Sequence, residues 1–228
     1  MFPLKDANPT LRVPVVTIGL IAANIVAFLF EPLAGSDLEQ ARFFVCNAAI
    51  PAEVMNGEQL ERLGHLFNCP GKNVWLSVLV SMFLHGGLLH IAGNMLFLWV
   101  FGNNVEDRLG RGRFVFFYLA CGAAATLAQS ALSRDSIVPL VGASGAIAGV
   151  LGAYLFMFPH ARVTTLFFYV VTDVPAVVVL AGWFLLQVFQ GVGSVRGAAS
   201  GGVAYFAHIG GFIAGIALLG LLRPRSAR

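Results

Sequence analysis

Charged residues are scarce in this sequence, and their scarcity indicates its class. Only 11% of the 228 side chains are Asp, Glu, Lys or Arg, whereas 58% are hydrophobic. Soluble domains carry about 25% charged and roughly 45–50% apolar residues. The composition therefore argues against a soluble enzyme and predicts an integral membrane protein. The formal charge of +3 is scattered over connecting segments, which argues against a nucleic-acid-binding surface.

Cysteine is also scarce, and repeats are absent. Cys46, Cys69 and Cys121 are too few for a disulfide framework. Cys46 and Cys69 share one long loop, so our hypothesis is that they pair if this loop faces an oxidising compartment. No internal repeat or low-complexity tract divides the chain, and we expect a single domain over residues 1–228.

Six apolar segments fill most of the chain and predict an all-α membrane protein with six transmembrane helices. The first is too long for a signal-peptide core and has no cleavage pattern behind it, so we expect it to be retained. The long connection Glu31–Val74 is expected to pack on the membrane surface. The predicted helices span residues 13–31, 75–101, 114–132, 142–158, 166–190 and 203–222.

The distribution of basic residues predicts that both termini lie in the cytoplasm. With the N-terminus inside, nine of the fourteen Lys and Arg residues fall on the cytoplasmic side. The compact chain without a targeting segment favours a bacterial inner membrane. The nine residues are Lys5, Arg12, Arg108, Arg111, Arg113, Arg162, Arg223, Arg225 and Arg228.

The fourth apolar segment, 142–158, is short and rich in glycine. A helix with so many small residues is expected to lie inside the bundle, where other helices approach it closely. Ser144 falls in its first turn, on the side away from the cytoplasm. There the helix offers unpaired backbone N–H groups and partial positive charge.

Histidine and asparagine side chains occur inside two other apolar segments, where polar groups are costly. The second segment contains His85, His90 and Asn94, the last two four residues apart and so on one helical face. The sixth contains His208. A lone His in such a segment is often structural, and His85, His90 and His208 could also be ligands of a metal or haem.

Glycine spacing suggests how the fourth and sixth segments meet. Gly211 and Gly215 follow His208 on one stripe, and Gly145 and Gly149 follow Ser144. If these small-residue faces pack together, Ser144 and His208 come within hydrogen-bond reach.

A serine beside a neutral histidine has the chemistry of a nucleophile and its general base. His90, Asn94 and the N–H groups that begin the fourth helix are candidate donors to an oxyanion. Asp173 is expected near the cytoplasmic end of the fifth helix, away from Ser144, so the sequence predicts a Ser–His dyad. The alternative for Ser144 is a hydrogen bond to its own or a neighbouring helix.

Three motifs on three segments resemble those of the rhomboid intramembrane serine proteases. They are HGGLLHIAGN, GASGA and AHIGGFIAG. The resemblance covers nearly the whole chain and implies a six-helix rhomboid-like bundle with a short buried fourth helix and a long first loop. It also implies Ser144 as nucleophile, His208 as base, His90 and Asn94 at the oxyanion, and His85 as support for the site.

The resemblance extends to three further segments. Glu106 and Arg108 match a cytoplasmic turn of the family that ties helices together. AGWF at 181–184 matches the part of the fifth helix that borders substrate entry, and residues 191–202 are expected to join that helix in a gate.

Two positions depart from the family pattern. Ala148 stands where many members have a tyrosine that stacks on the histidine base, and Tyr205 is a candidate to orient His208 instead. The tryptophan–arginine pair of the first loop is not evident, since Leu76 follows Trp75.

We therefore expect an intramembrane serine endopeptidase that cleaves transmembrane segments of other proteins near the extracytoplasmic face. Its partners would be those substrates and the lipid bilayer; no cofactor, metal or nucleic acid is expected. The alternative is a catalytically inactive rhomboid-like protein that binds transmembrane helices.

Overall fold

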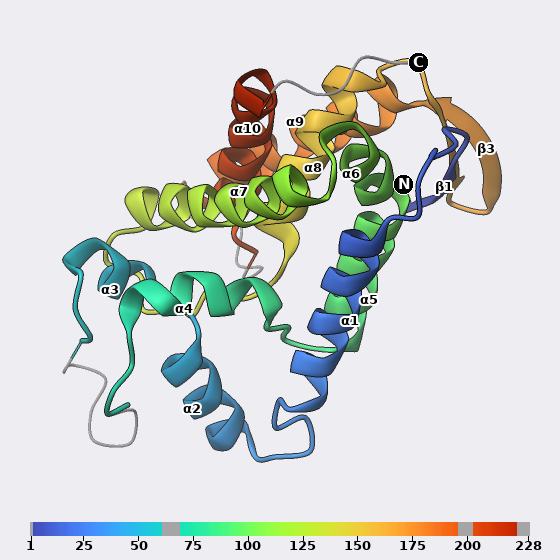
Figure 1. Cartoon of the computed structure of the whole chain (residues 1–228). Coiled ribbons are helices and arrows are strands. Elements are labelled where there is room, and N and C mark those ends of the chain that lie inside the picture. Colours follow the sequence, from blue (N-terminus) through green and yellow to red (C-terminus); the bar gives the residue numbers. More distant parts are fainter. Residues whose placement is uncertain (1, 61–68, 196–202, 223–228) are drawn as a thin grey trace.

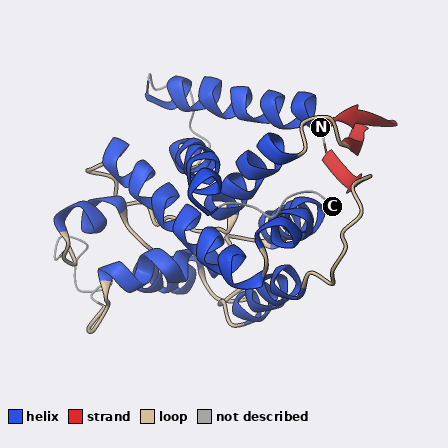
Figure 2. Cartoon of the chain, turned by 45° about the horizontal axis from the view of Figure 1, so that its top comes forward, coloured by secondary structure: helices blue, strands red, loops and turns tan. Residues whose placement is uncertain are grey.

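The computed structural model describes residues 2–60, 69–195 and 203–222 (Figure 1). Within them the chain is mostly helical, with a three-stranded antiparallel sheet of order β1-β2-β3 at one edge (Figure 2). Residues 196–202 of the expected gate, and the arginines after Leu222, lie outside the described residues.

The helices form a bundle from which the loop helices α2, α3 and α4 extend on the side away from the sheet (Figure 1). A short 3₁₀ turn, Ser81–Phe83, follows α4, and a π turn, Leu98–Gly102, joins α5 to α6. The strands are β1 (Phe2–Asp6), β2 (Arg162–Phe167) and β3 (Val170–Pro175). The helices are α1 (Val15–Leu29), α2 (Asp37–Asn47), α3 (Pro51–Asn56), α4 (Val74–Val80), α5 (Leu88–Phe97), α6 (Asn103–Leu109), α7 (Arg111–Leu132), α8 (Ser144–Met157), α9 (Ala176–Val195) and α10 (Tyr205–Leu222).

Four of the described helices are long and apolar enough to cross a membrane. They are the continuous helix Leu88–Leu109, α7, α9 and α10. The apolar helices α1 and α8 have 15 and 14 residues, which is shorter than the roughly 20 that a full crossing needs. The expected number of six spans therefore stays a prediction.

The predicted helix over 75–101 is wrong in its middle. The 3₁₀ turn ends at Phe83, and α5 begins only at Leu88. Gly87 has a φ of +153°, which residues with a side chain rarely adopt, so the helix is interrupted there.

The predicted helix over 166–190 is wrong over its first ten residues. Residues up to Pro175 form the β2–β3 hairpin, and α9 starts at Ala176. This stretch is rich in Val, Thr and Phe, which favour strands, so hydropathy alone does not distinguish it from a helix. Asp173 therefore lies in a strand, where its carboxylate accepts a 2.7 Å hydrogen bond from Thr164.

The long loop between α1 and α4 contains the short helices α2 and α3 and is closed by a covalent bond. Helix α2 begins with a capping box, in which Ser36 and Glu39 bond each other's backbone and side-chain groups. Cys46 and Cys69 form a disulfide, as hypothesised, and Cys121 is a free, buried thiol.

The short helix α8 lies inside the bundle, packed between α7 and α10, and ten of its fourteen residues are buried. Its glycine face meets that of α10. A Cβ on Gly211 would collide with the carbonyl oxygen of Gly145, and one on Gly215 with that of Gly149. The two glycine faces lie against each other, and their backbones are in direct contact.

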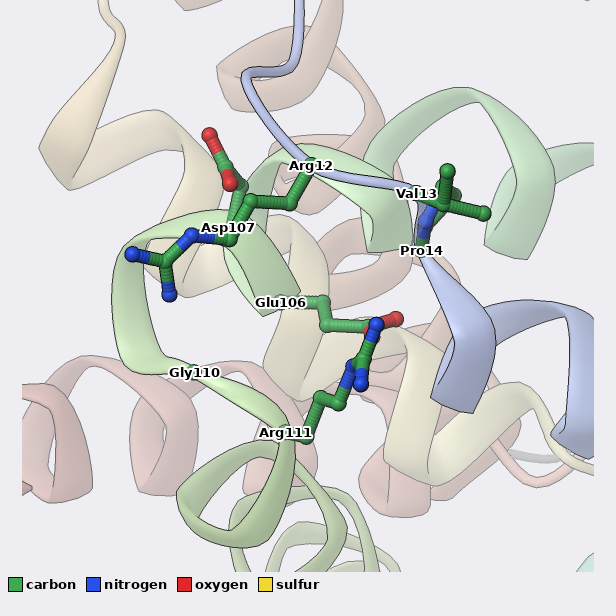
Figure 3. Close-up of a pocket in the computed structure, with 7 residues that line it drawn as sticks. All are labelled: Arg12, Val13, Pro14, Glu106, Asp107, Gly110 and Arg111. Carbon is green, nitrogen blue, oxygen red and sulfur yellow. The ribbon is translucent and has the colours of Figure 1, made fainter.

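Glu106 of α6 ties its helix to the start of α1. Its carboxylate accepts hydrogen bonds from the backbone N of Val16 (3.0 Å) and Thr17 (2.7 Å) and from the Thr17 hydroxyl (2.8 Å). The residue borders a pocket of about 320 Å³ that Arg12 and Arg111 also line (Figure 3). The carboxylate therefore caps α1 from a distant part of the chain.

Two further contacts hold the same end of the molecule together. Arg108 lies 5.4 Å above the ring of Phe158, just after α8. Asp6 of β1 accepts 2.7 Å hydrogen bonds from Tyr154 and Asn104, and partial burial raises the pKa of its carboxyl.

Candidate active site

Ser144 is the first residue of α8, whereas strand β2 follows the other end of this helix. Gly142, two residues earlier, has a φ of +123°, and its N–H donates to the carbonyl of Ser81 at 2.9 Å. Within the helix the first backbone bond runs from Ile147 to Ala143. The N–H groups of the first turn are therefore free of intrahelical partners and surround the serine.

His208 of α10 contacts Ser144 directly. Its Nε2 lies 2.8 Å from the serine Oγ. Its Nδ1 lies 2.8 Å from the side-chain oxygen of Gln187, which belongs to α9. The ring of Trp183, one turn before Gln187, is 5.7 Å from the imidazole. Three helices thus meet at one imidazole, and both of its nitrogens are hydrogen-bonded.

His90 of α5 lies on the other side of Gly142. A Cβ built on Gly142 would be 2.8 Å from Nε2 of His90 and 3.6 Å from Oγ of Ser144. The N–H of Gly86 donates to Nδ1 of His90 at 3.4 Å. Because Nδ1 accepts this bond, the proton of the neutral ring is on Nε2, which is then a donor beside the serine.

His85 and Asn94 are near the site but have other bonds. The backbone N of His85 donates to Glu31 at 2.7 Å, and its buried ring packs edge-on against that of His90 at 5.1 Å. The side-chain amide of Asn94 donates to the carbonyl of His90 at 3.1 Å, one turn back along α5. Both residues contact His90, His85 through its ring and Asn94 through its side-chain amide.

A small cavity adjoins Ser144 between α7, α8 and α10. Its volume is about 30 Å³, enough for a water molecule. The hydroxyl-bearing side chains that line it are Ser81, Thr126 and Ser144. A space for one water molecule beside the hydroxyl, with hydroxyl groups in part of its lining, is compatible with hydrolytic chemistry.

The three histidines do not form a metal site. In the described part of the chain no three His, Cys, Asp or Glu side chains are grouped as metal ligands. The alternative of His85, His90 and His208 as a ligand set has no geometric support, since both nitrogens of His208 already have partners.

Two residues next to His208 were not predicted from the sequence. Gln187 is hydrogen-bonded to the imidazole, and Trp183 packs against it. Tyr205, which the sequence offered as a candidate to orient His208, lies beside Gly191 of α9 instead. The available signal was Gln187 itself, one of two glutamines in a mostly apolar helix without charged residues.

A family model described as Rhomboid domain matches residues 72–225, and several curated proteins are similar to this chain. Rhomboid protein 1, mitochondrial, of Saccharomyces cerevisiae is 35% identical over 62% of this chain and 40% of its own length. Rhomboid protease GluP of Bacillus subtilis is 43% identical over 36% of this chain and 16% of its own.

The human presenilin-associated rhomboid-like protein, mitochondrial, is 28% identical over 65% of this chain and 34% of its own length. The matched segments therefore span less than half of each of these three relatives.

Proposed function

The chain belongs to the rhomboid family and is a multi-pass integral membrane protein, and on that premise we propose that it is an intramembrane serine endopeptidase with a Ser144–His208 dyad. The observation that carries the proposal is the 2.8 Å separation between Oγ of Ser144 and Nε2 of His208. This is the distance at which a neutral imidazole can take the hydroxyl proton.

In the proposed first step, Oγ of Ser144 attacks the carbonyl carbon of a substrate peptide bond while its proton passes to Nε2 of His208. The imidazolium then gives this proton to the leaving amine, which departs as the acyl-enzyme forms. Water, activated by the same imidazole, releases the acyl group. The cavity of about 30 Å³ beside Ser144 supports a supply of water at this point.

The developing oxyanion needs hydrogen-bond donors that are already in position. We assign this role to Nε2–H of His90, to the N–H groups at the start of α8, and to the second amide proton of Asn94. His85 supports the ring of His90 from the same segment. Gly145, Gly149, Gly211 and Gly215 let α8 and α10 approach closely enough for the dyad to form.

We propose that the substrates are transmembrane segments, cut near the extracytoplasmic face. A helical segment hides its peptide bonds in i→i−4 hydrogen bonds, so it must unwind locally, which favours Gly, Ser or Pro near the cut. The six spans of the proposed single domain, 1–228, are α1, the helix Leu88–Leu109, and α7 to α10.

With both termini in the cytoplasm, as proposed, Ser144 and the Cys46–Cys69 loop share the opposite side, where disulfides persist. A bacterial inner membrane remains our proposal for the compartment. Two of the relatives named above carry the word mitochondrial in their names and one comes from Bacillus subtilis.

Substitution of the dyad tests the proposal. Ser144→Ala and His208→Ala should each lower cleavage of a transmembrane substrate in proteoliposomes by at least about 10³-fold. The double variant should lose no more than either single one, because groups that act as a unit are not additive.

A matched control uses another buried serine. Ser130 of α7 is fully buried, and its hydroxyl has no hydrogen-bond partner. Ser130→Ala should cleave substrate and react with a fluorophosphonate probe like the unchanged protein. Unaltered cleavage by Ser144→Ala would show that Ser144 is not the nucleophile. Absence of both cleavage and probe labelling in the unchanged protein would instead indicate an inactive family member that binds transmembrane helices.

A further inference from the structure

The hydrogen bond between Gln187 and His208 is not accounted for by a dyad that consists of Ser144 and His208 alone. Gln187 is on α9, its side chain is only 7% exposed, and its Oε1 lies 2.8 Å from Nδ1 of His208. The rest of α9 contains no charged residue. A buried amide in an apolar helix is costly unless it is bonded.

We propose that Gln187 is a positioning residue of the active site, which holds the imidazole of His208 in the tautomer that can accept the serine proton. This inference rests on the proposed peptidase function. Gln187 does not touch the reacting atoms, and it acts through His208.

The tautomer follows from the chemistry of the amide. A side-chain carbonyl oxygen only accepts, so Nδ1 of His208 must carry the proton in this bond. The neutral ring then has its lone pair on Nε2, directed at the hydroxyl of Ser144. Without the acceptor, the proton can occupy Nε2 instead, and in that form the ring cannot act as a base towards Ser144.

The same bond also stabilises the charged intermediate state. When Nε2 takes the proton of Ser144, the positive charge is shared with Nδ1–H, which still donates to the amide oxygen. A hydrogen bond with a charged donor is stronger than a neutral one, so the interaction increases as the proton is transferred. Gln187 itself gains and loses no proton.

Because Gln187 is on α9, its hydrogen bond to His208 depends on how α9 packs against α10. Trp183 lies one turn earlier on the same face and packs on His208, and Phe184 stacks on Phe212 of α10 at 4.4 Å. The base is therefore oriented only while α9 is packed against α10. If α9 moves to admit a substrate, it must return before His208 is again aligned.

Few other titratable groups can account for a pH effect at this site. Helix α9 has none, and within α8 and α10 the other titratable side chains are Tyr154 and Tyr205. From the other described elements, the nearby titratable side chains are His90 beside Gly142, His85 against the ring of His90, and Cys121 of α7 beside Gly149. None of the variants below changes them.

Matched glutamine substitutions test the proposal in the full-length protein. Gln187→Met keeps the shape of the side chain but removes the strong acceptor. Gln129→Met makes the same change at a glutamine of α7 whose oxygen accepts from the backbone of Ala207, next to His208 but not on its ring. Gln187→Glu keeps an acceptor and adds charge.

Steady-state cleavage and fluorophosphonate labelling are measured against pH for all three variants, the unchanged protein and Ser144→Ala. Gln187→Met should lower kcat roughly tenfold at similar KM, the scale of one buried hydrogen bond. The acid limb of its pH–rate profile should move to lower pH, because the imidazolium of His208 loses a hydrogen-bond acceptor. Gln187→Glu should recover kcat, with its acid limb about one unit or more higher, because a carboxylate stabilises the imidazolium. Gln129→Met should shift neither limb.

Equal effects of Gln187→Met and Gln129→Met, or a Gln187→Glu profile that does not move, would overturn the proposal and leave Gln187 as a packing residue. Absence of both cleavage and labelling in the unchanged protein would instead refute the peptidase function. The two failures are therefore distinguishable.

Discussion

At the scale of single residues, Gly142 lies next to two side chains of the proposed active site, His90 and Ser144. It lies between the imidazole of His90 and the hydroxyl of Ser144, with a φ of +123°. A side chain there meets both a strained backbone and a ring that is itself held by a bond from Gly86. The glycine therefore sets how closely the donor approaches the serine.

Gly142→Ala should lower substrate cleavage about tenfold or more and destabilise the protein by about 1–3 kcal/mol. Initial rates and unfolding in detergent measure both effects. The control is Gly93→Ala on α5, where an added Cβ has no atom within 4 Å. It should leave cleavage unchanged, and full activity of Gly142→Ala would contradict the steric argument.

The contact between Ser144 and His208 was predictable from the sequence, because each residue precedes a pair of glycines at the spacing of one helical face. The Gln187 contact was not. Which side of α9 turns towards His208 depends on how Phe184 packs against Phe212, and no local pattern specifies that packing. For the same reason the sequence offered Tyr205 as a candidate to orient His208, whereas Tyr205 lies beside Gly191 of α9.

At the scale of elements, the packing of α8 against α10 depends on glycines, whose lack of a side chain lets the two backbones come into contact. Gly215→Ala should destabilise the protein by about 3 kcal/mol, since its Cβ would collide with the carbonyl of Gly149 and a backbone cannot yield as a side chain can. The loss is measured from the unfolding midpoint in mixed detergent micelles.

Gly220→Ala on the same helix is the matched control, because no atom lies within 4 Å of its added Cβ. Helix propensity predicts a neutral effect or a gain of up to about 1 kcal/mol there. Equal midpoints for the two variants would show that the faces do not pack as described.

The helices were predictable where hydropathy and helical propensity agree, as in α7 and α10. They were not where other forces act within an apolar run. At Gly87, just before α5 begins, the backbone conformation is not helical. In β2 and β3 the β-branched residues pair across strands, with β1 completing the sheet. Window-averaged hydrophobicity does not detect either effect.

At the scale of the whole molecule, the disulfide fixes the loop that precedes α4. The bond closes a sequence separation of 23 residues. Replacement of Cys46 and Cys69 by Ser should lower the free energy of unfolding by about 3 kcal/mol. A reductant should destabilise the unchanged protein equally, and it should have no effect on the double variant.

The accessibility of the same disulfide to a reductant shows on which side of the membrane the loop lies. In right-side-out vesicles, a membrane-impermeant reductant should open it if the loop and Ser144 face outward. Protection from the reductant until the vesicles are lysed would reverse the proposed topology.

The cap that Glu106 provides for α1 also has a consequence for the order of biosynthesis. The residues it joins are 89 and 90 positions apart. At about 5–20 residues per second, the ribosome needs roughly 5–18 s to reach Glu106 after Thr17 has been made. During that interval the first helix has no internal partner for its leading N–H groups, so lipid headgroups or the insertion machinery must solvate them. The start of α1 thus lacks its cap until α6 has been made, just before α7 begins.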